Sequence, residues 1–113
     1  MNILFSDAFD REIKRLARKY PSLSAEVFQL TQELRTNPTQ GTPMGRDCYK
    51  IRLAIASKGK RNAARGKSGG GRVITCVKVT AKTMTLLTIY DKAEQEDIPD
   101  RTLTKILKDN DLL

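Results

Sequence analysis

The sequence of 113 residues contains no His and no Trp, and only two Cys. Histidine is the commonest general base and the commonest metal ligand, so its absence excludes a ribonuclease with a His pair and a zinc hydrolase. Aromatic residues make up only 5% of the chain, which argues against a platform on which single-stranded bases stack. We therefore expect no metal and no other cofactor.

The two cysteines, Cys48 and Cys76, each lie in a predicted strand and lack C-x-x-C spacing, so they are expected to be buried, reduced thiols rather than a disulfide. Residues 1–7 form too short an apolar stretch for a signal peptide and include an acid where a leader would be basic. No apolar run approaches the length of a membrane span. These features predict a cytoplasmic protein without a membrane partner.

Positive charge is concentrated in one third of the chain. Eleven of the 21 Lys and Arg residues lie between Arg46 and Lys82, where Asp47 is the only acid, and the whole chain has a net charge of +8. Such a concentration indicates a surface that binds phosphates, because neutralising a nucleic-acid backbone releases counterions. An even scatter of the same charges would have indicated only solubility.

Two apolar runs in this third, at 49–55 and 72–79, flank a segment rich in Gly and Lys and predict a β-hairpin with a basic tip. The first run alternates strictly, so that Lys50 and Arg52 share the face opposite to its apolar residues. Pairing of the two strands would place Arg72 beside them. Three neighbouring cations without an interleaved acid repel one another unless an anion joins them.

The remaining segments supply three helices and two more strands. Residues 3–5 read as a short strand, followed by two amphipathic helices that Pro21 separates, a loop at 37–47, the hairpin, a strand at 84–90 and a helix at about 100–109. We expect an α+β fold in the order β-α-α-β-β-β-α within a single domain, residues 1–113. The helical hairpin should cover one face of an antiparallel meander and leave an open, concave basic face.

Three stretches together resemble the RelE/ParE superfamily of toxins from bacterial type II toxin-antitoxin pairs, nearest its RelE and HigB-like branch. They are 47–53 (DCYKIRL), 66–74 (GKSGGGRVI) and 86–92 (LLTIYDK). The likeness extends over nearly the whole chain. It implies a RelE-like toxin that enters the ribosomal A site and cuts mRNA, with the 2′-hydroxyl as nucleophile and a cyclic phosphate as product. It also implies a cognate antitoxin as partner, beside the ribosome and mRNA.

The resemblance also assigns residues. Lys50 and Arg52 match the paired cations of the family, and Arg72 matches the arginine that follows its glycine loop. RelE-type members have a further arginine after the last strand and a tyrosine near the C-terminus, and the residues offered here for those roles are Lys92 and Tyr90. These five are the candidate catalytic residues.

The other cations of the hairpin are candidates for binding RNA. Residues 61–65 look like an insertion in the tip relative to the family. The basic residues expected to contact RNA phosphates are Lys58, Lys60, Arg61, Arg65, Lys67 and Lys78.

Without His, cleavage has to be driven by positioned cations. Crowding by Arg52 and Arg72 disfavours the charged form of Lys50, which would let it act as the base toward a 2′-hydroxyl. The two arginines would stabilise the negative charge of the phosphorane. Three alternatives stay open: the cations only hold rRNA phosphates, the protein is a ParE-like gyrase inhibitor, or it is a catalytically inactive RNA-binding protein with the toxin fold.

Overall fold

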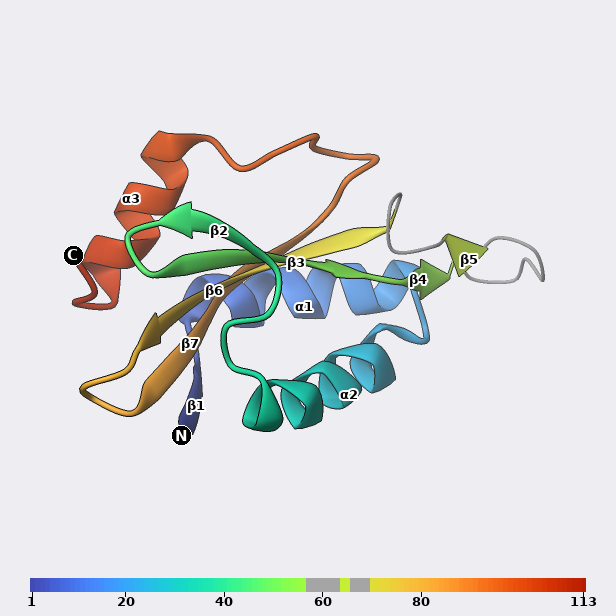
Figure 1. Ribbon diagram of the computed structural model, residues 1–113. Helices are drawn as coiled ribbons and strands as arrows, with labels where there is room; N and C mark the ends of the chain where they lie inside the picture. The colour runs from blue at the N-terminus through green and yellow to red at the C-terminus, as the bar shows by residue number, and fades with distance from the viewer. Residues whose placement is uncertain (57–63, 66–69) are drawn as a thin grey trace.

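The computed structural model describes residues 1–56, 64–65 and 70–113 (Figure 1). The predicted order of helices and strands is confirmed, with three short strands added. In chain order the elements are β1 (Asn2–Phe5), α1 (Asp7–Lys19), α2 (Leu23–Thr36), β2 (Thr42–Gly45), β3 (Cys48–Leu53), β4 (Ile55–Ala56), β5 (Ala64–Arg65), β6 (Gly71–Lys78), β7 (Thr83–Asp91) and α3 (Asp100–Asp109).

The main sheet has the strand order β1-β7-β6-β3-β2. The expected antiparallel meander of β3, β6 and β7 forms its centre, and β1 joins β7 in parallel. β4 and β5 pair separately as a two-stranded ribbon. The prediction of a loop at 37–47 is wrong in its second half, because β2 pairs with β3 at the edge of the sheet, a place that tolerates Pro43 and the irregular register beside it.

Local sequence signals fix the limits of the helical hairpin. The Ser6 hydroxyl caps α1, accepting from the Phe9 amide at 3.0 Å and donating to the Leu87 carbonyl at 2.5 Å. Pro21 and Pro38 each directly follow the residue that caps the C-terminus of a helix, Tyr20 for α1 and Asn37 for α2. In the described part of the chain, no helix combines the length and the apolar character that a bilayer crossing needs.

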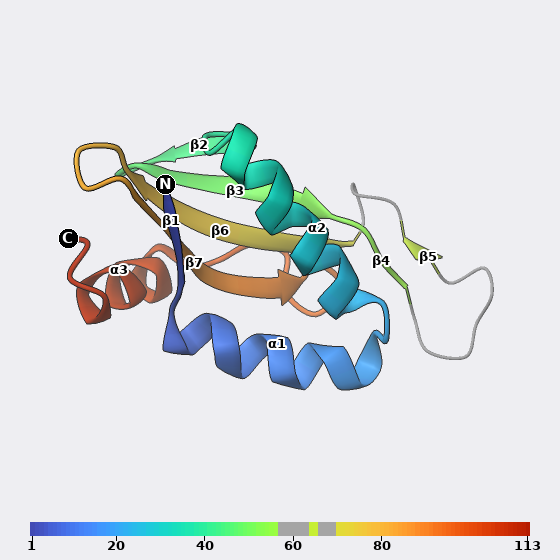
Figure 2. The same ribbon diagram turned by 90° about the horizontal axis from the view of Figure 1, so that it is seen from below.

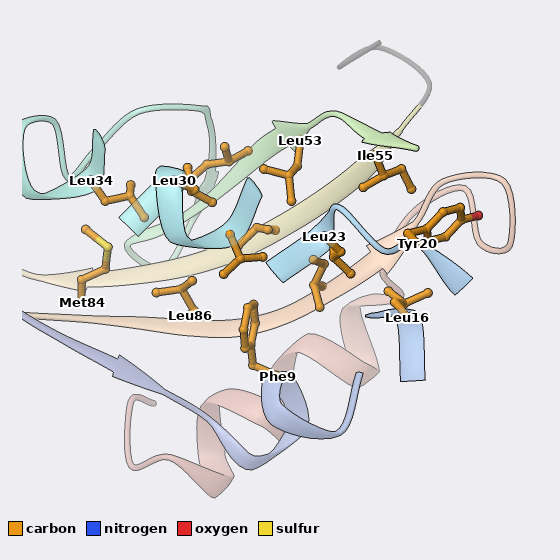
Figure 3. Packing of buried hydrophobic residues seen from close by; sticks show 14 of the residues in the cluster. Phe9, Leu16, Tyr20, Leu23, Leu30, Leu34, Leu53, Ile55, Met84 and Leu86 are labelled. Carbon is orange, nitrogen blue, oxygen red and sulfur yellow. The ribbon is translucent and has the colours of Figure 1, made fainter. Parts of the chain in front are cut away.

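The larger core lies between the helical hairpin and one face of the sheet (Figures 2 and 3). The predicted stripes of both helices point into it, and the apolar positions of β3 meet them from the sheet. Its buried members include Phe9, Leu16, Tyr20, Leu23, Val27, Leu30, Leu34, Ile51, Leu53, Val73, Met84, Leu86 and Ile89.

A second, smaller core lies on the opposite face, where α3 packs (Figure 1). An irregularity in the pairing of β6 with β7, between Ile74 and Thr75, places Leu87 on this side although Ile89 stays on the other. Leu103, Ile106 and Leu107 of α3 are buried here, as their spacing predicts. This face is therefore open only beyond the part that α3 covers.

Candidate functional site

Beyond α3, the same face of the sheet holds a pocket of about 530 Å³. The strand register places Arg52 directly opposite Arg72, and Lys50 one pleat away on the same face. Lys92 reaches the pocket from the end of β7. The lining residues are Thr42, Lys50, Arg52, Arg72, Lys92, Glu96 and Asp97, so four of the five candidate catalytic residues come together in one concave site.

The two arginines hold their guanidinium groups differently. Arg52 is exposed, whereas Arg72 is only 5% exposed and donates to the Gly71 carbonyl oxygen at 3.0 Å. A guanidinium is charged at any pH that a folded protein meets. The site therefore contains one cation that is fixed in the wall and one that can follow a ligand.

Lys50 has a carboxylate partner that the sequence did not reveal. Its Nζ donates to Oδ1 of Asp97 at 3.0 Å. The lysine, together with the amide of Ile98, lowers the pKa of the Asp97 carboxyl. An ion pair needs the ammonium form, so this geometry supports Lys50 as a cation and not as the free base that crowding by two arginines predicts.

Tyr90 lies next to this pocket but does not line it. The residue is 3% exposed and its hydroxyl donates to Oδ1 of Asp97 at 3.2 Å. Burial, followed by the charge and hydrogen bond of Asp97, raises the pKa of Tyr90 to about 12, against an opposing effect of Arg72. At neutral pH the phenol is therefore a hydrogen-bond donor, and among the described residues it donates to Asp97.

A neighbouring pocket of about 560 Å³ lies between α1 and α3, and Tyr90 contributes to its wall. Its charged lining residues are three acids (Asp7, Glu12 and Asp109) and two cations (Arg11 and Lys105), whereas the pocket around Arg52 and Arg72, the cationic pocket, has four cations and two acids. The cationic pocket is thus the one whose lining suits a polyanion.

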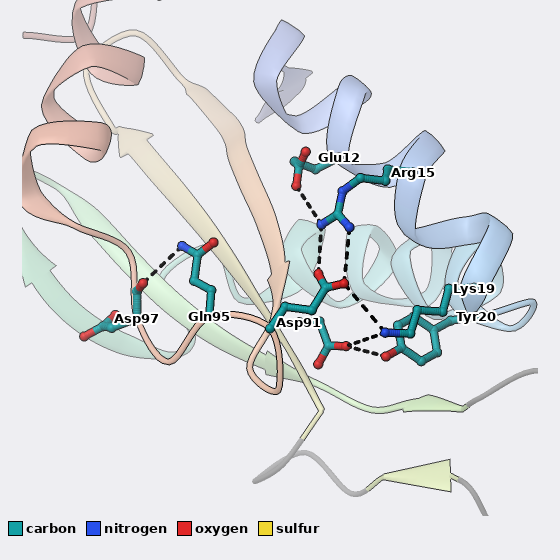
Figure 4. Close-up of polar contacts among 8 residues, drawn as sticks. Glu12, Arg15, Lys19, Tyr20, Asp91, Gln95 and Asp97 are labelled. Carbon is teal, nitrogen blue, oxygen red and sulfur yellow. Dashed lines mark hydrogen bonds and ion pairs between the residues drawn. The ribbon is translucent and has the colours of Figure 1, made fainter.

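The chain that carries Asp97 is tied to α1 where it leaves β7 (Figure 4). Asp91 is fully buried and accepts from the Tyr20 hydroxyl and, at 2.9 Å, from the Ala93 amide. Arg15 donates to both carboxylate oxygens of Glu94, at 2.9 and 3.2 Å. Arg15 lowers the pKa of the Glu94 carboxyl, so the Arg15–Glu94 ion pair is charged at neutral pH.

The predicted RNA-binding cations are not all near this pocket. Lys78 pairs with Asp47 at 3.0 Å, and it is separated from Arg72 along β6 by Ile74 and Cys76, which α3 covers. At about 3.3 Å per residue, this places it about 20 Å from Arg72. Arg65 belongs to β5, and the other four, Lys58, Lys60, Arg61 and Lys67, lie outside the described residues.

Cys48 and Cys76 are free and buried, as expected. They are directly opposite each other on β3 and β6, and both thiols donate to the Arg46 carbonyl oxygen, at 3.5 and 3.9 Å. They lie in the smaller core under α3, away from the cationic pocket.

Comparisons with known proteins show the fold and no more. No family model matches the sequence, and no curated protein matches it either. Among solved structures, the chain is similar to the E. coli toxin RelE, a double arginine-to-alanine mutant in the free state, with a TM-score of 0.57. The match has 14% sequence identity and covers 96% of this chain and 95% of that one. The chain therefore has a RelE-like toxin fold.

Proposed function

We propose that this protein is the toxin of a toxin-antitoxin pair, and that it cuts mRNA in the ribosomal A site as a metal-independent endoribonuclease. The observation that carries the proposal is the gathering of Lys50, Arg52, Arg72 and Lys92 in one pocket of an otherwise packed sheet face. The RelE-like fold supports the same conclusion, because the similar solved structure is that of a toxin.

The proposed reaction is a transesterification within the message. The 2′-oxygen attacks the adjacent phosphorus and the bond to the 5′-oxygen breaks, which leaves a 2′,3′-cyclic phosphate and a 5′-hydroxyl. The 2′-hydroxyl loses one proton and the leaving oxygen gains one. Arg52 and Arg72 stabilise the extra negative charge of the phosphorane, a role for which the planar guanidinium group, with its several N–H donors, is well suited.

Lys50 acts in this scheme through its ammonium group. The ion pair with Asp97 favours a positive charge that contacts the scissile phosphate and can hand a proton to the leaving 5′-oxygen. Lys92, which is exposed at the rim, adds a further contact to the RNA backbone. Tyr90 contributes through Asp97, since its hydroxyl is buried beside that carboxylate.

The partners proposed for this chain are a cognate antitoxin, the ribosome and mRNA. An antitoxin that covers the cationic pocket, or supplies acids to it, would deny RNA access to the pocket and so neutralise the toxin.

Expression from a tightly controlled promoter, followed by mapping of breaks in cellular mRNA, tests the proposal. We expect growth arrest with breaks that are phased to codons and that disappear when translation is blocked beforehand. Arrest with intact message and with inhibited DNA gyrase would instead identify a ParE-like activity. RNA binding without breaks would identify an inactive protein with the toxin fold.

A further inference from the structure

We infer that Asp97 is a positioning residue of the cationic pocket, which holds the Lys50 ammonium and the Tyr90 hydroxyl on one carboxylate oxygen. The inference rests on the proposed function for its consequence in catalysis, and on the geometry of the site for the contact itself. Both donors reach Oδ1, Lys50 at 3.0 Å and Tyr90 at 3.2 Å.

Asp97 is itself held by the backbone. Its Oδ1 accepts from the Ile98 amide at 2.8 Å, and its carbonyl oxygen accepts from the Gln95 side-chain amide at 3.0 Å (Figure 4). The next residue, Ile98, is buried in the smaller core, and Pro99 caps α3. The carboxylate is therefore attached to a short segment whose far end is packed.

These contacts distinguish a positioning residue from an acid that only blocks the pocket. A blocking acid has to move out when RNA binds. Here that movement would break the bond from the Ile98 amide to the carboxylate, beside a buried isoleucine, as well as the bonds from Lys50 and Tyr90. A lysine ammonium has three donors, and the bond to Asp97 occupies one of them. Within residues 1–56, 64–65 and 70–113 the other two make no hydrogen bond, so Asp97 and an RNA phosphate can hold Lys50 at the same time.

The contact with Asp97 restricts the conformations of the long Lys50 side chain. A lysine side chain loses rotamer entropy when it is fixed, and a preorganised contact meets that cost before the substrate arrives. Removal of Asp97 should therefore reduce turnover more than RNA affinity. It also removes a negative charge from the pocket, which by itself would strengthen RNA binding.

Glu96 supplies a matched control. It lines the same pocket and has the same charge, and within the described part of the chain it makes no hydrogen bond to Lys50 or Tyr90. Glu96→Ala and Asp97→Ala remove one carboxylate each from the same site. Only the second removes the contact proposed to position Lys50.

The experiment measures turnover on programmed ribosomes at saturating enzyme, and binding to an RNA oligonucleotide, for the parental protein, Asp97→Ala, Asp97→Asn and Glu96→Ala. We expect the turnover of Asp97→Ala to be about tenfold below that of Glu96→Ala, with RNA binding unchanged or tighter in both variants. Asp97→Asn, which keeps an acceptor oxygen, should fall between them. Turnover of Asp97→Ala that rises, or that matches Glu96→Ala, would overturn the inference.

A readout without RNA separates this inference from the proposed function. Asp97 is one cause of the raised pKa of Tyr90, so NMR titration of labelled tyrosines should show that pKa fall in Asp97→Ala and stay near 12 in Glu96→Ala. Tyr90→Phe assigns the resonance. If the parental protein does not cut RNA, the proposed function fails, but the titration still tests the contact between Asp97 and Tyr90. If the pKa of Tyr90 is the same in Asp97→Ala as in the parental protein, the contact is overturned whatever the activity.

Discussion

The two faces of the main sheet are made from the same strands and differ in what covers them. One face is closed along the helical hairpin by apolar side chains, whereas on the other α3 covers Cys48, Ile74 and Cys76 and leaves Arg52 and Arg72 beside a pocket. The first face accounts for most of the buried apolar core. The comparison teaches that the larger core and the proposed RNA-cutting site lie on opposite sides of a single layer of strands. Substitutions in the larger core should therefore act mainly on stability, and those in the pocket mainly on cleavage.

The sharpest test of the closed face is Phe9→Ala. Phe9 is 2% exposed in the larger core, and truncation of a buried Phe typically costs about 3–5 kcal/mol of unfolding free energy. Phe28→Ala is the matched control, because Phe28 lies on the same helical hairpin but is 65% exposed. Denaturant unfolding should show a loss of that size for the first variant and under about 0.5 kcal/mol for the second. Equal losses would contradict the assignment of the core.

On the open face we expect the reverse pattern from Arg52→Ala. Arg52 is exposed, so its removal should leave the unfolding free energy nearly unchanged, while loss of one charge-stabilising donor lowers cleavage about a hundredfold. Arg101→Ala, an exposed arginine on α3 that lines neither pocket, removes the same charge elsewhere. Equal cleavage by the two variants would reduce the role of Arg52 to general attraction of RNA.

Gly41 lies directly before β2, where the chain comes close to β3, the strand that carries Lys50. It has φ of +103°, and a Cβ atom there would lie 2.6 Å from the Lys50 carbonyl oxygen. Gly41→Ala should therefore cost more than about 1 kcal/mol of unfolding free energy and also reduce cleavage. Gly45→Ala has the strained φ of +83° with open space around the new atom, so it should cost less. A smaller loss at Gly41 than at Gly45 would refute the close approach.

The smallest expected effect is a pH dependence of the unfolding free energy. Because Lys50 lowers the pKa of Asp97, the folded protein binds fewer protons there than the unfolded chain does. The stabilisation is complete above the ordinary Asp value of about 4 and is lost as the pH falls through the lower folded value. The stability difference between the parental protein and Asp97→Asn should shrink across that range in urea unfolding. A difference that stays constant with pH would show that the pair does not form.

The parts of the fold that depend on local signals could be predicted. The break at Pro21 and the alternation from Tyr49 to Leu53 act over a few residues, and each is found where the sequence places it, although the strand ends at Leu53 and Ile55 belongs to β4. β2 was missed because a four-residue edge strand with Pro43 and a register shift has almost no periodicity. The sequence did not predict which face of the sheet α3 covers. An apolar stripe indicates that a helix packs against the rest of the protein, but it does not indicate which surface the helix packs against.

The residues of the candidate site also divide into those that local sequence patterns predict and those that they do not. Alternation along β3 predicts that Lys50 and Arg52 share a face, and pairing adds Arg72, because both follow from the geometry of a hairpin. Asp97 lies 47 residues beyond Lys50 in the sequence, and nothing local to either residue indicates the contact. The missed partner changes the proposed chemistry most, since the contact with Asp97 favours a role of Lys50 as a cation over the expected role as a base.

The central claim is that the uncovered part of the α3 face cuts RNA, and Arg72 tests it most directly. Arg72→Met keeps most of the side-chain volume at a buried position but removes the charge, and retention of the fold is checked by thermal unfolding. Turnover of ribosome-bound mRNA is then measured at saturating enzyme. We predict turnover about a hundredfold below that of the parental protein. Parental turnover once the variant is saturated would contradict a catalytic site and leave Arg72 with a role in binding alone.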